Sequence, residues 1–168
     1  FKSDQDSIDR SEKELKVSIR KSYELYLLMI GLIVEVADVA AERIEINQAK
    51  LMPTEDDLNP NRRFVDNRVV KLIEGSKALG DALNQYKVSW RGQKPLIKKL
   101  YNDMVEAPYY KAYLENPKTG FSEDKQFVIE FLSTHIEDNH YFEEAMEELS
   151  MFWVDDICYS LGLAIRTI

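Results

Sequence analysis

A helical repeat of apolar residues runs through the early part of the chain, from residue 7 to residue 51. Its apolar positions are three and four residues apart, at Leu15, Ile19, Tyr23, Tyr26, Ile30, Ile33 and Ala37. This spacing is the period of an α-helix. One unbroken helix over the segment would be roughly 60 Å long, which is more than a small domain can cover. We therefore expect a bend at Gly31, because glycine weakens a helix interior by about 1 kcal/mol relative to alanine.

Shorter segments with the same period fill most of the remaining sequence. Pro53 and Pro60 end the first repeat, and Thr54 and Asp57 between them have the spacing of a capping box, which predicts one short helical turn. Ser122 is a candidate N-cap residue. Further helices are expected over residues 65–86, 96–105, 109–114, 122–136, 141–151 and 154–168. No period-two strand pattern is found. The sequence predicts a single all-α domain over residues 1–168, an irregular bundle of about six to seven helices.

Composition limits the compartment and the class of partner. A hydrophobic content of 45% with 31% charged residues is typical of a globular protein. The net charge of −8 disfavours a general polyanion-binding role for the chain as a whole. The single cysteine, Cys158, has no second cysteine to pair with, which favours a cytoplasmic protein. The longest apolar run, at residues 25–34, is too short to span a bilayer, so we expect no membrane partner.

Motifs for catalysis, cofactors and metals are weak or missing in the sequence. It contains no G-x-S-x-G, no glycine-rich phosphate loop and no H-E-x-x-H. Glu137 and His140 match E-x-x-H, but a di-metal helical bundle needs two such motifs. His135 is five residues from His140, so the two imidazoles would point apart on a helix. We expect a solvated polar turn here, with no metal, no cofactor and no catalytic residue.

An acidic segment lies between Ser122 and Asp156, with eleven acidic residues against one lysine. Its densest part has four glutamates at helical spacing: Glu143, Glu144, Glu147 and Glu148. Two interpretations stay open for them. They form a solvated helix face, or they form a docking surface for a basic partner such as a ribosomal protein or a basic segment of the same polypeptide.

A basic segment between residues 82 and 102 contains no acidic residue. Its cations alternate with aromatic rings, as in surfaces that neutralise phosphates and stack on bases. The candidate RNA-binding residues are Lys87, Trp90, Arg91, Lys94, Lys98 and Lys99. The alternative is that Trp90 fills the core at a turn while the lysines solvate a helix. The arginines at 62, 63 and 68 extend this patch, or they pair with the acidic residues 55–57 of their own loop. We expect the acidic and basic segments at opposite ends of the molecule.

The block at residues 50–67, K-L-M-P-T-E-D-D-L-N-P-N-R-R-F-V-D-N, resembles one found in long, variant bacterial NusB-like proteins, the transcription antitermination factors. Residues 11–26, S-E-K-E-L-K-V-S-I-R-K-S-Y-E-L-Y, resemble the second helix of that family. The pattern over residues 127–153, with Asp155 and Asp156 after it, is similar to the end of the extended N-terminal half.

This resemblance implies a function. NusB-type proteins are all-helical, bind a boxA-type RNA together with the ribosomal protein NusE, and help the RNA polymerase complex read through terminators. The arginine-rich first helix of the family would precede Phe1, and its C-terminal helical subdomain would follow Ile168. We therefore expect a non-catalytic fragment of a NusB-like factor, with no RNA-contacting residue of the family carried over to a position here. The alternative is an acidic protein–protein interaction module without RNA contact.

Overall fold

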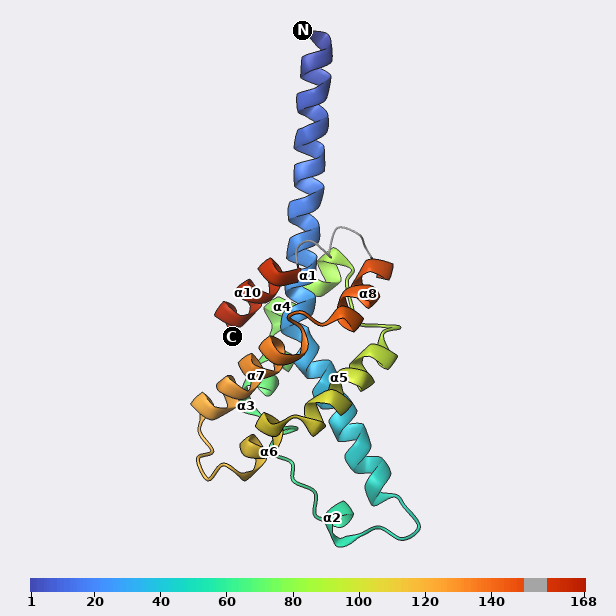
Figure 1. Cartoon of the computed structure of the whole chain (residues 1–168), viewed down its shortest axis with the longest axis vertical. Helices are drawn as coiled ribbons and strands as arrows, with labels where there is room; N and C mark the ends of the chain where they lie inside the picture. Colours follow the sequence, from blue (N-terminus) through green and yellow to red (C-terminus); the bar gives the residue numbers. More distant parts are fainter. Residues whose placement is uncertain (150–156) are drawn as a thin grey trace.

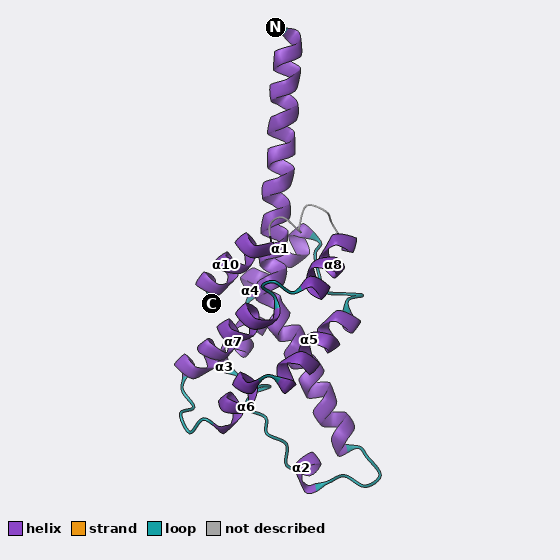
Figure 2. Cartoon of the chain, viewed as in Figure 1, coloured by secondary structure: helices purple, strands orange, loops and turns teal. Residues whose placement is uncertain are grey.

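The computed structural model describes residues 1–149 and 157–168, and these residues form nine helices and no strand (Figure 2). The helices are α1 (Lys2–Gln48), α2 (Glu55–Leu58), α3 (Arg68–Glu74), α4 (Lys77–Tyr86), α5 (Lys94–Glu106), α6 (Pro108–Glu115), α7 (Phe121–His135), α8 (His140–Leu149) and α10 (Ile157–Thr167). The prediction of an irregular all-α bundle is confirmed. In the described part of the chain, no helix combines the length and the apolar content needed to cross a membrane.

The long helix α1 is the axis of the fold. Its second half packs against α3, α4, α5 and α10, whereas no other described helix covers its first part, which extends from the body (Figure 1). Residues 1–17 are all exposed, and burial on this helix begins at Glu24 and Leu25. The helix continues through Gly31, and Figure 1 shows its axis changing direction within the body. A helix too long for a small domain to cover is thus accommodated mainly by leaving its first part uncovered.

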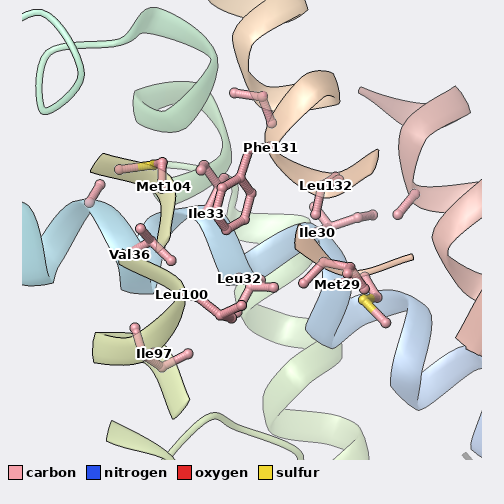
Figure 3. Close-up of a cluster of buried hydrophobic side chains, with 14 of the residues drawn as sticks. Met29, Ile30, Leu32, Ile33, Val36, Ile97, Leu100, Met104, Phe131 and Leu132 are labelled. Atoms are coloured by element: carbon pink, nitrogen blue, oxygen red, sulfur yellow. The ribbon is translucent and has the colours of Figure 1, made fainter. Parts of the chain in front are cut away.

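The core lies where α1, α5 and α7 meet (Figure 3). Ile33 of α1, Leu100 and Met104 of α5, and Phe131 and Leu132 of α7 are fully buried there. Burying a side chain of this size contributes about 1.5–3 kcal/mol relative to leaving it exposed. On α1 the helical repeat read from the sequence faces the core from Ile30 to Ala37, whereas its first members, Leu15, Ile19 and Tyr23, are exposed.

Two helix boundaries differ from the prediction. The helix expected over residues 65–86 is two helices, because Gly75 ends α3 and the Ser76 hydroxyl caps α4 by accepting from the Leu79 N–H at 3.2 Å. The expected N-cap, Ser122, lies inside α7, which starts after Gly120 and has no side-chain cap. Of the two last predicted helices, residues 150, 151 and 154–156 lie outside the described residues.

The block at residues 50–67 contains the predicted capping box. The Thr54 hydroxyl accepts from the Asp57 N–H at 3.1 Å, and the Asp57 carboxylate accepts from the Thr54 N–H at 3.0 Å. Asp57 also pairs with Lys50 at 3.1 Å. Arg62 pairs with Asp66, and Arg63 donates to two backbone carbonyls in the α6–α7 turn. Arg62 and Arg63 therefore do not pair with acidic residues 55–57, which was one of the two alternatives for them.

The end of this block is tied to α6 and α7 by a buried polar junction. The Asn67 side chain caps α3 by accepting from the N–H groups of Val69 and Val70. Its amide also donates to the Tyr113 hydroxyl and to the Asp124 carbonyl, both at 3.1 Å. The Tyr113 hydroxyl donates in turn to the Asp124 carboxylate at 2.8 Å. These hydrogen bonds give the block a structural role, because they fix its end against two distant helices.

Candidate RNA-binding and protein-docking surfaces

The candidate RNA-binding residues stay together in space because they lie on one short helix–turn–helix segment. Lys87 ends α4 in the left-handed conformation, with φ of 54°. Arg91 lies in the following turn, where Gly92 has φ of 85°. The three lysines Lys94, Lys98 and Lys99 follow on the first turns of α5. Local backbone geometry therefore turns the acid-free segment into one basic surface.

Trp90 does not belong to this surface. Its side chain is only 6% exposed, and its indole N–H donates to the Leu28 carbonyl of α1 at 2.9 Å. The ring also lies 6.2 Å from the ring of Phe142 on α8. The prediction that Trp90 stacks on RNA bases is wrong, because the ring joins α1 and α8 in the core. The alternative interpretation of Trp90 as a core residue is confirmed.

Acidic residues of α1 lie next to the basic surface. Glu42 pairs with Lys94 at 3.1 Å. The hydrogen bond from Lys94 is the main cause of the lowered pKa of Glu42. Lys98 lowers the same pKa by its charge. Glu35 and Asp38 line one groove with Arg91 and Lys94. The lysines at the start of α5 are thus partly neutralised by carboxylates that are distant in the sequence.

Burial changes the ionisation of two of these carboxyl groups. It raises the pKa of Glu35, and repulsion from Asp38 raises this pKa further. Burial also raises the pKa of Asp38, with an added contribution from Glu74 and an opposing one from Lys71. Both shifts reduce the negative charge beside the basic surface as the pH falls.

Three of the predicted cations are exposed and make no ion pair among the described residues: Lys87, Arg91 and Lys98. We refer to these as the exposed cations. Lys99, by contrast, is half-buried and pairs with Asp103 at 3.0 Å, while its ammonium lies 5.2 Å from the centre of the Tyr141 ring. The exposed cations are therefore the part of the surface that is available for phosphates.

The four predicted docking glutamates lie on one side of α8. Phe142 and Met146 bury the opposite side of this helix. Glu144, Glu147 and Glu148 are exposed, and Glu143 is partly covered. The imidazole of His140 lies 3.1 Å from Glu144 and 4.0 Å from Glu143. The segregation of glutamate from apolar residues is compatible with both interpretations drawn from the sequence.

The acidic and basic surfaces are neighbours. Phe142 of α8 packs near the buried Trp90 of the α4–α5 turn, and Tyr141 of α8 contacts Lys99 of the basic surface. The expectation of opposite ends is wrong, because distance along the chain does not set distance in space. Phe142 of α8 is fully buried near Trp90, and this packing holds α8 against the α4–α5 turn.

Two buried polar groups were not recognised as a pair from the sequence. His135 is buried on α7, and its ring lies 5.6 Å from the ring of Tyr109 on α6. Burial lowers the pKa of His135, and the charge of Asp103 opposes this shift. Burial also raises the pKa of Tyr109. In the described residues, no cluster of three histidine, cysteine, aspartate or glutamate side chains has the arrangement of a metal site.

No family model, curated protein or solved structure matches the chain.

Proposed function

We propose that the chain is a non-catalytic, helical part of a NusB-like transcription antitermination factor, which acts by binding boxA-like RNA and NusE. The resemblance of the block at residues 50–67 supports the family. The RNA-binding part of this proposal rests on the α4–α5 turn. There Lys87, Arg91 and Lys98 are exposed and free of ion pairs with described residues.

The chemistry of this turn favours contacts to phosphates. Lysine and arginine side chains neutralise phosphates and release counterions, which binds RNA without reading its sequence. Trp90 is buried, and Tyr86 packs against Tyr23 with ring centres 5.1 Å apart. We therefore propose that the exposed cations supply affinity, whereas the choice of RNA sequence depends on other parts of the full-length factor and on NusE.

A charge-matched comparison tests this proposal. Fluorescence anisotropy with a labelled boxA-like RNA measures the affinity of the wild-type chain and of the triple variant Lys87→Ala, Arg91→Ala, Lys98→Ala. The control is Lys111→Ala, Lys118→Ala, Lys125→Ala, which removes the same charge from exposed positions elsewhere. We expect the first variant to lose most of the affinity and the control to keep it. Equal affinities of the two variants would contradict the assignment of this surface.

The acidic face of α8 supports a second candidate function, that of a protein-docking module. A basic partner such as NusE would be attracted to Glu144, Glu147 and Glu148, which are exposed on one side of the helix. Complementary charge of this kind mainly raises the association rate and suppresses wrong partners.

The docking candidate is tested by capture of NusE on the immobilised chain. The variant Glu144→Gln, Glu147→Gln, Glu148→Gln should capture much less NusE than the wild type. A control with Glu106→Gln, Glu115→Gln, Glu130→Gln, also at exposed positions, should capture as much as the wild type. Equal capture by both variants would exclude α8 as the docking surface. RNA binding by the α8 variant would show that RNA binding does not need the docking surface.

A further inference from the structure

In the described part of the chain, the first part of α1, residues 2–19, forms an arm that extends from the body as a single helix (Figure 1). Its residues up to 17 are all exposed. Ion pairs one turn apart support it, with Arg10 and Glu14 3.0 Å apart and Lys16 bound to Glu12. Such pairs contribute only about 0.2–0.5 kcal/mol each, and isolated helices are marginally stable in water. A second helix alongside the arm would stabilise it.

The arm has a narrow apolar stripe. Ile8, Leu15 and Ile19 are separated by seven and four residues, which places them on one side of the helix at 3.6 residues per turn. Their exposed fractions are 59%, 61% and 61%. Val17, also exposed, points to the opposite side. The stripe is as narrow as the seam of a two-stranded coiled coil rather than the wider face that packs on a protein core.

The two flanks of the stripe differ in chemistry. One flank has Asp9 and Glu12 toward the start of the arm and Lys16 and Arg20 toward the body. The other flank has small residues, with serines at 7, 11 and 18. In an antiparallel pair of identical helices, each flank faces the same flank of the other copy. The acidic end of one charged flank therefore lies beside the basic end of the other charged flank. The two-fold axis repeats this contact, so it occurs twice in the dimer. In a parallel pair the charged flank would face the serines instead.

We infer that the partner of this arm is the arm of a second copy of the chain, packed antiparallel about a two-fold axis near Leu15. In this register Asp9 faces Arg20 of the partner subunit, and Glu12 faces Lys16 of the partner subunit. Ile8 packs beside Ile19 of the partner subunit, and the serine flank lets the two backbones approach closely. This inference is independent of the proposed RNA-binding function.

The apolar surface of the stripe continues from the arm onto the body of the protein. Tyr23 and Tyr26 follow the stripe on α1 and lead into an apolar groove whose other walls include Leu72, Leu79 and Phe121. Leu72 and Phe121 are among the exposed large hydrophobic residues. In the antiparallel pair, the start of each arm lies over this groove of the other copy. The dimer would therefore cover the stripe and the groove together.

Sedimentation equilibrium of the full 168-residue chain tests the pairing. We expect the molar mass to double with rising concentration. The variant Leu15→Glu, Ile19→Glu should raise the dimer dissociation constant by about a hundredfold or more, because each lost contact counts twice in a two-fold pair. The control Val17→Glu, on the opposite side of the arm, should dimerise like the wild type. A wild-type chain that stays monomeric up to about 1 mM, or equal dimerisation of Val17→Glu and Leu15→Glu, Ile19→Glu, would overturn the inference.

A charge exchange between the two copies distinguishes loss of pairing from poor folding of the arm. The variant Asp9→Lys, Glu12→Lys and the variant Lys16→Glu, Arg20→Glu should each dimerise weakly alone, because like charges then face each other. An equimolar mixture of the two should dimerise at least as well as the wild type. A mixture that stays as monomeric as its components would overturn the inference.

The orientation is tested by cross-linking in a Cys158→Ser background, which removes the only native thiol. A Ser11→Cys chain and a Ser18→Cys chain are mixed and oxidised with copper phenanthroline. The antiparallel register brings positions 11 and 18 of different copies together, so the mixed disulfide should dominate. A mixed disulfide that does not exceed the 11–11 and 18–18 disulfides would overturn the inference.

Discussion

Trp90 shows at the scale of one residue how a core position can resemble a binding position. The cations around it in the sequence suggest a stacking ring, whereas its indole N–H bonds to α1 and its ring packs near Phe142. We expect Trp90→Ala to lower the free energy of unfolding by about 3–5 kcal/mol, because it opens a cavity and leaves the Leu28 carbonyl unpaired. Trp90→Phe should cost less. Urea unfolding followed by circular dichroism measures both. A loss below about 1 kcal/mol for Trp90→Ala would contradict the buried position.

Asn67 links three helices through one side chain, and its removal should be costly. It is 1% exposed and bonds to α3, to Tyr113 and to Asp124. We expect Asn67→Ala to lower the free energy of unfolding by about 2–4 kcal/mol, from the lost cap and the unpaired buried groups together. Asn102→Ala, at an exposed position on α5, is the control and should change it by less than about 0.5 kcal/mol.

His135 should make stability depend on pH. Its folded-state pKa is lowered by burial, so below the unfolded-state value of about 6.5 the unfolded chain binds a proton that the folded chain resists. This contribution to stability is complete above that value and is lost as the pH falls through it, with a slope of at most about 1.4 kcal/mol per pH unit.

The variant His135→Gln isolates this effect from the opposing contributions of Glu35 and Asp38, whose raised pKa values favour the fold at low pH. Between pH 7 and pH 5 we expect the stability of His135→Gln to fall less steeply than that of the wild type. His140→Gln, at an exposed position, serves as the control. Equal slopes for His135→Gln and the wild type, measured by urea unfolding at each pH, would contradict this assignment.

At the scale of the element, glycines in different settings should respond oppositely to alanine. Gly31 lies inside α1, and a Cβ there would meet no described atom within 4 Å apart from the neighbouring helix backbone. Gly31→Ala should therefore raise the free energy of unfolding by about 0.5–1 kcal/mol. Gly92 has φ of 85° in the α4–α5 turn. Gly92→Ala should therefore lower the free energy of unfolding by about 1 kcal/mol. Thermal unfolding of both variants checks the signs, and stabilisation by Gly92→Ala would contradict the turn geometry.

Some elements could be predicted from the sequence because local signals and tertiary packing agree. The repeat of α1 and the capping box of Thr54 and Asp57 are of this kind. The break at Gly75 and Ser76 was missed, because the apolar spacing continues across it with little change. For the site, the clustering of the exposed cations follows from their nearness in the sequence. The burial of Trp90 does not, because its partners come from α1 and α8.

At the scale of the whole molecule, the neighbouring acidic and basic surfaces should influence each other. α8 lies against the α4–α5 turn, with the rings of Phe142 and Trp90 6.2 Å apart. We therefore expect its carboxylates to lower the potential at the exposed cations at low salt, where screening is weak. The variant Glu144→Gln, Glu147→Gln, Glu148→Gln should therefore bind RNA more tightly than the wild type at low salt, and the difference should shrink as salt rises. Anisotropy titrations at two salt concentrations measure this. Weaker RNA binding by the variant would contradict the arrangement.

The central claim is that the exposed cations of the α4–α5 turn bind RNA through its phosphates. The most direct test is the salt dependence of boxA-like RNA binding, measured for the wild type and for Lys87→Ala, Arg91→Ala, Lys98→Ala. For a single strand, each phosphate neutralised contributes about −0.7 to the slope of log K against log salt, so we expect a slope of about −2 for the wild type and one close to zero for the variant. The same slope in both proteins, or no saturable binding by the wild type at low salt, would contradict the claim.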